Sequence, residues 1–144
     1  MKNVKMLIAL FAVLLLVSGC APKESRLECT QNASGVDVGF NVDFKGSVIK
    51  DINITYDMDL AKYNDTQIKA IEKQDFCKIV KEAMSDYEKG FNNCTQNVEN
   101  KKLNVKANID INKISKSLLD SIQKPDDAKT EIEDQGYKCN LIEK

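Results

Sequence analysis

A two-residue alternation of apolar and polar side chains marks three segments of the chain. Between residues 36 and 44 every second residue is valine or phenylalanine, and the intervening residues are polar or glycine. Residues 48–60 alternate in the same way, with Lys50 as the only polar residue in the apolar phase, and so do residues 103–111. This period is typical of β-strands with one buried and one solvated face. The three segments therefore predict long strands of an antiparallel sheet, the first two joined by a tight turn at Lys45-Gly46.

Between residues 64 and 90 the apolar period lengthens to that of an α-helix. Residues 64–66, Asn-Asp-Thr, are typical of a helix N-terminus, and Gly90 is typical of a helix end. We therefore expect one helix here. The apolar residues on its predicted inner side are Ile68, Phe76, Ile79, Val80, Ala83, Met84 and Tyr87.

Weaker signals complete the expected order of elements. Short strands are predicted at residues 27–31, 94–98 and 137–141, and a short helix at residues 114–122. Pro125 suits the first turn of a further helix that ends at Gly136. The resulting order, β-β-β-α-β-β-α-α-β, predicts an α+β fold in which helices pack on one side of an antiparallel sheet.

The first twenty residues have the organisation of a cleaved leader. Two lysines precede an unbroken apolar run over residues 6–17, which is shorter than the roughly 20 residues that span a bilayer comfortably. Small residues follow at Ser18 and Gly19. We therefore expect a signal peptide over residues 1–19, a tether over residues 20–26 and a single α+β domain over residues 27–144.

The end of this leader, Val17-Ser18-Gly19-Cys20, resembles the bacterial lipobox. In proteins with that motif the cysteine thiol receives a diacylglycerol group, and cleavage occurs just before it. The resemblance implies that Cys20 is the lipidated first residue of the mature protein, carrying acyl chains such as palmitate on the extracytoplasmic face of the cell membrane. Two or three such chains hold a protein durably. The alternatives are an ordinary secretory leader with a coincidental cysteine, or an uncleaved buried helix.

The other four cysteines, Cys29, Cys77, Cys94 and Cys139, predict two structural disulfides. An even number of cysteines in an oxidising compartment favours this interpretation. The absence of a Cys-x-x-Cys spacing and of any histidine argues against a zinc site or a thioredoxin-like redox centre. Buried free thiols are the alternative.

Three pairings of these cysteines are possible, and strand phase together with chain reach favours one of them. Cys29 and Cys139 share the apolar phase of the first and last strands, so they can meet if those strands are neighbours. Cys77 can reach Cys94 only if the intervening helix ends by about Gly90 and the chain returns extended. We therefore expect the bridges Cys29–Cys139 and Cys77–Cys94.

The mature chain is similar to the YehR-like family of small bacterial lipoproteins. The similarity rests on the lipobox, a strand ending in residues 44–46 (Phe-Lys-Gly), a strand running into Asp59-Leu60, and a terminal helix closing on residues 136–138 (Gly-Tyr-Lys). It implies an α+β lipoprotein domain of unknown activity. The four cysteines are not part of that general pattern.

Composition narrows the function classes. Without the leader the chain holds 19 basic and 22 acidic side chains, a formal charge of −3, with no basic stripe for nucleic acid. Lack of histidine removes Ser/His and Cys/His catalysis. Acidic groups at Asp51, Asp57 and Asp59, beside Asn53, fit a solvated strand face better than a Ca²⁺ site. Another acidic group, Glu131, Glu133 and Asp134, fits a wet helix surface.

These observations predict a membrane-tethered, non-catalytic binding or interaction module that needs no cofactor or metal. The predicted partner is the membrane, to which the module is attached through the lipid on Cys20. Nucleic acid is not an expected partner. Two alternatives stay open at this point. One is a protein that captures a small ligand or an ion, and the other is an enzyme of envelope polymers that uses paired carboxylates.

Overall fold

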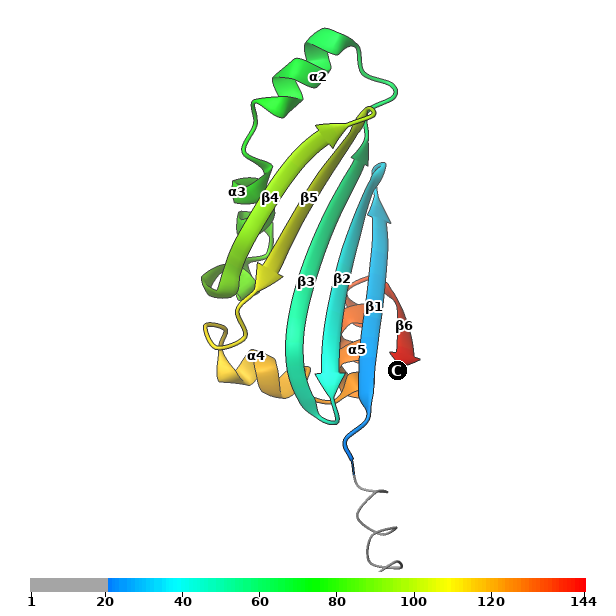
Figure 1. Cartoon of the computed structure of the whole chain (residues 1–144), viewed down its shortest axis with the longest axis vertical. Helices are drawn as coiled ribbons and strands as arrows, with labels where there is room; N and C mark the ends of the chain where they lie inside the picture. Colours follow the sequence, from blue (N-terminus) through cyan, green and yellow to red (C-terminus); the bar gives the residue numbers. More distant parts are fainter. Residues whose placement is uncertain (1–20) are drawn as a thin grey trace, which may run out of the picture.

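A six-stranded antiparallel sheet organises the computed structural model, which describes residues 21–144 (Figure 1). Its strand order is β4-β5-β3-β2-β1-β6. The strands are β1 (Glu24–Ala33), β2 (Val36–Lys45), β3 (Val48–Asp59), β4 (Phe91–Glu99), β5 (Lys102–Ile109) and β6 (Lys138–Glu143). The helices are α2 (Asp65–Glu72), α3 (Phe76–Ala83), the 3₁₀ helix η1 (Ser85–Gly90), α4 (Lys116–Ser121) and α5 (Pro125–Asp134).

One face of this sheet forms the hydrophobic core. Leu27, Val42, Ile52 and Leu103, from four neighbouring strands, are fully buried, as the apolar phase of the sequence predicts. Helix α5 contacts β1 and β6, and α3 contacts β4 and β5, so the helices of residues 21–144 lie on this face of the sheet (Figure 1). The α+β class predicted from the sequence is confirmed, although the exact order of elements differs from the prediction. Within residues 21–144, no helix has the length and apolar character needed to cross a membrane.

The single helix predicted between residues 64 and 90 is wrong, because the chain divides there into α2, α3 and η1. A tertiary contact and a local N-cap accompany the break. The side chain of Gln96, on β4, accepts a hydrogen bond from the Phe76 amide at 2.8 Å, and Asp75 accepts one from the Lys78 amide at 2.9 Å. These two acceptors satisfy amides that open the first turn of α3. The observed order is therefore β-β-β-α-α-3₁₀-β-β-α-α-β, with one more α-helix and a 3₁₀ turn than predicted.

Gly90 does end the helical segment, and close packing requires a glycine there. A Cβ atom at this position would lie 2.7 Å from the Asp110 carbonyl oxygen and 2.8 Å from the Ile114 Cγ2 atom. The Gly90 carbonyl accepts a hydrogen bond from the Asp110 amide at 2.7 Å, which ties the start of β4 to the end of β5.

Strands β1 and β4 each begin three residues earlier than the sequence pattern predicts. β1 begins at Glu24 rather than at Leu27, because Glu24 and Ser25 pair with Lys45 and Phe44 of β2. The predicted tether over residues 20–26 is therefore too long, since residues 24–26 belong to the sheet. β4 likewise begins at Phe91, three residues before the predicted start.

Candidate functional site

Two disulfides cross-link the fold, one between two strands of the sheet and one between a strand and a helix. Cys29 of β1 lies opposite Cys139 of β6 with their Cα atoms 4.0 Å apart, and Cys77 of α3 is joined to Cys94 of β4 with Cα atoms 5.8 Å apart. These are the same pairs as the sequence favours. Cys29 and Cys139 are buried in the core, so the bridge between them is part of the packed interior. Cys20, the predicted lipidation residue, lies outside the described residues.

The face of the sheet that is turned away from the helices is open, and Figure 1 views the molecule from this side. Antiparallel register aligns its side chains in rows across the strands. One row, which we call the asparagine row, contains five asparagines and one glutamate. From β6 to β4 its members are Asn140, Glu28, Asn41, Asn53, Asn108 and Asn92.

A shallow hollow of about 350 Å³ lies over the middle of this face. Seven of its nine lining residues are polar and supply side-chain amides, a hydroxyl group and two cations. The residues are Arg26, Asn41, Asn53, Ile54, Thr55, Asn93, Lys106, Ala107 and Asn108. The row next to the asparagine row aligns Gly39, Thr55 and Lys106. The Thr55 hydroxyl group packs over Gly39, in the space that a Cβ atom at this position would need.

A bulge in β4 brings Asn93 to the rim of the hollow. The register of β4 against β5 shifts between Asn92 and Thr95, and Asn93 has a φ of +47°. Bulges re-aim side chains in this way. Cys94, the next residue, is bonded to Cys77, so this disulfide fixes the bulge to α3.

The carboxylates of Asp43 and Asp51, beside the hollow, accept hydrogen bonds from neighbouring side chains. The Arg26 guanidinium donates two hydrogen bonds to the Asp43 carboxylate, each 2.7 Å long. Asp51 lies directly opposite Asp43 on the neighbouring strand, and it accepts hydrogen bonds from the side-chain amides of Asn53 and Asn108. The repulsion between two adjacent carboxylates is thereby offset.

The hydrogen bond from Arg26 lowers the pKa of Asp43 below its ordinary value. Because the folded protein then binds the proton more weakly than the unfolded chain does, this pair stabilises the fold above about pH 4 and stops doing so as the pH falls through the lowered pKa. We expect Asp43→Asn to lose at most about 1 kcal/mol at pH 7, since the pair is partly solvated. Urea unfolding between pH 3 and pH 7 should show a smaller acid-induced loss in the variant. Identical pH profiles for the two proteins would contradict the assignment.

Other groups on the face are free to contact a ligand. Within residues 21–144, no side-chain hydrogen bond or ion pair is formed by the Lys106 ammonium group or the Asn41 amide. Lys106 is exposed and Asn41 is half-buried. Both line the hollow, so unused donors and acceptors converge there.

The acidic residues considered from the sequence do not form a metal centre. The Asp57 carboxylate accepts a hydrogen bond from the Asn104 amide at 2.8 Å, and Asp59 accepts one from the backbone amide of Ala61. Glu131, Glu133 and Asp134 are exposed on α5. In the described part of the chain no three metal-ligating side chains cluster. The alternation in the sequence predicts the polar strand face but not the asparagine row, because alternation reveals a face and not the register of its strands.

No protein-family model, curated protein or solved structure matches this chain significantly. The candidate site is therefore defined by its geometry alone: an uncovered sheet face with a polar hollow and unused hydrogen-bonding groups.

Proposed function

We propose that this protein is a lipid-anchored, non-catalytic binding module of the bacterial cell envelope that binds its ligand on the open face of the sheet. The observation that carries the proposal is the polar hollow. A face that is merely solvated requires no particular side chains, whereas here the free Lys106 ammonium group and the free Asn41 amide line the same hollow. The lipobox at Val17 to Cys20 supports the anchor.

The chemistry of the hollow favours an acidic, hydroxyl-rich polymer such as a carboxylate-bearing envelope glycan. The free side-chain amide of Asn41 offers both donors and an acceptor, which suits hydroxyl groups. Lys106 supplies a charge for a carboxylate. No aromatic ring is among the described residues that line the hollow, so hydrogen bonding and charge would carry recognition.

Two observations favour this function over the alternatives. Catalysis by paired carboxylates needs one carboxyl group that is protonated near neutral pH. Asp43, the carboxylate nearest Arg26, has a lowered pKa and is paired. A small ligand is normally enclosed on most of its surface, and this hollow is shallow and open. A polymer lying along the strands fits such a surface better.

We expect titration of residues 21–144 with acidic glycan fragments to shift amide NMR signals of the hollow. Lys106→Glu should weaken binding by about tenfold or more, because a hydrogen bond to a charged group contributes roughly 1.5 kcal/mol or more. Lys69→Glu on α2 makes the same charge change on an exposed residue away from this face and is the matched control. Equal affinities of the two variants, or signal shifts confined to the helices, would contradict the proposal.

A further inference from the structure

The described chain enters the sheet beside the hairpin that joins β2 to β3. The Gly46 amide donates a hydrogen bond of 2.7 Å to the carbonyl of Lys23, the residue before β1. Figure 1 shows that this entry point, the hairpin and α4 lie at one end of the long axis, whereas α2 lies at the other. We call residues 45–50 together with α4 the hairpin end.

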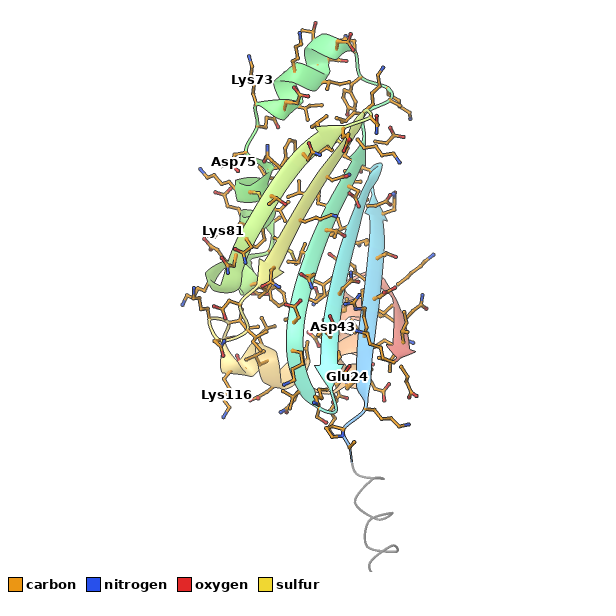
Figure 2. The ribbon with its side chains drawn as sticks, viewed as in Figure 1. Glu24, Asp43, Lys73, Asp75, Lys81 and Lys116 are labelled. Carbon is orange, nitrogen blue, oxygen red and sulfur yellow. A yellow bond between two sulfur atoms is a disulfide. The ribbon has the colours of Figure 1, made fainter. Side chains whose placement is uncertain are left out.

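The hairpin end combines one exposed and two partly buried apolar side chains, Val48, Ile111 and Leu119, with lysines. A second hollow of about 300 Å³ lies there, lined by Ser47, Val48, Ile49, Ile111, Lys116, Leu119, Asp120 and Gln123. Val48 at the turn is 56% exposed, the largest value among the large apolar side chains of residues 21–144. Lys45, Lys50 and Lys116 are exposed around it, and Figure 2 places Lys116 at this end together with the acidic Glu24.

The distance from Cys20 to this surface is short. Only Ala21, Pro22 and Lys23 separate Cys20 from the start of β1. Three fully extended residues span at most about 10 Å, which brings Lys23 and the hairpin within that distance of Cys20. The headgroup layer on each side of a bilayer is roughly 5 to 8 Å thick. A lipid on Cys20 would therefore hold the hairpin end at the headgroups.

We propose that the hairpin end is a membrane-contacting surface that rests on the bilayer carrying the lipid anchor. This inference rests on the proposed lipid anchor at Cys20. Val48, Ile111 and Leu119 contact the boundary between headgroups and acyl chains, and the three lysines contact anionic phospholipid headgroups. Because the strands run along the long axis, the open face then stands upright from the membrane and its hollow stays accessible to envelope polymers.

The chain contains no tryptophan, so a single introduced tryptophan reports its own surroundings. We would prepare the lipidated mature protein with Val48→Trp, and with Tyr63→Trp as the matched control. Tyr63 is 39% exposed in the connection between β3 and α2, at the opposite end. Each would be reconstituted in vesicles of phosphatidylglycerol and phosphatidylethanolamine with brominated acyl chains. We expect Val48→Trp fluorescence to be blue-shifted and quenched at least about twofold, and Tyr63→Trp fluorescence to be unchanged.

A second variant tests the role of charge. Adding Lys45→Glu and Lys116→Glu to the Val48→Trp protein should reduce the quenching in these anionic vesicles. If the protein floats with the vesicles while Val48→Trp is no more quenched than Tyr63→Trp, the membrane-contacting surface is refuted and the lipid anchor stands. If the protein does not float with vesicles at all, the anchor is refuted and this inference falls with it.

Discussion

Replacing both Cys29 and Cys139 with alanine should lower the free energy of unfolding by about 4 to 5 kcal/mol. The bridge closes a loop of 110 residues, nearly the whole domain, and removing it restores the conformational freedom of the unfolded chain. It also fastens the six-residue strand β6 to β1 at the sheet edge. We expect the melting temperature to fall by roughly 15 °C. Chemical and thermal unfolding of the purified domain would measure both quantities.

The shorter bridge provides the matched comparison. Replacing Cys77 and Cys94 with alanine opens a loop of 17 residues, for which the same chain-entropy argument gives about 3 kcal/mol. The two double variants should therefore differ by more than about 1 kcal/mol, with the Cys29 and Cys139 variant the less stable. A loss below about 1 kcal/mol for the longer bridge, or the reverse order, would contradict its structural role.

The sequence pattern predicts the sheet better than the helices. Alternation over residues 36–44, 48–60 and 103–111 is long enough to identify β2, β3 and β5 without other information. The division of the helical segment could not be predicted in this way. Gln96 lies 20 residues beyond Phe76, and its contact with the start of α3 exists only after β4 has packed. Local capping signals contain no trace of such a distant acceptor.

The candidate site likewise depends on contacts between residues that are far apart in the sequence, which the local pattern does not predict. The polar phase of each strand predicts a solvated face, but the asparagine row depends on which strands are neighbours and how they align. Asn53 and Asn108 are 55 residues apart and meet because β5 pairs with β3. The bulge that turns Asn93 toward the hollow likewise depends on the pairing of β4 with β5. Register, rather than composition, creates the site.

Replacing Cys20 with serine should move the protein from the membrane fraction to the soluble fraction. Serine cannot form the thioether through which a lipobox cysteine carries its diacylglycerol. None of the helices in residues 21–144 could anchor the chain by spanning the bilayer. Fractionation of cells that produce each variant would measure the effect, and the Cys77→Ala, Cys94→Ala variant should stay with the membrane. Unchanged fractionation of Cys20→Ser would contradict a lipid anchor at this residue.

The most direct test of the tethered module is the covalent structure of its mature N-terminus. Intact mass spectrometry of protein extracted from membranes, followed by fragmentation of the N-terminal peptide, should show a chain that begins at Cys20. The thiol of Cys20 should carry a diacylglycerol group. A mature protein that still begins at Met1, or one that begins at an unmodified Cys20, would contradict the account.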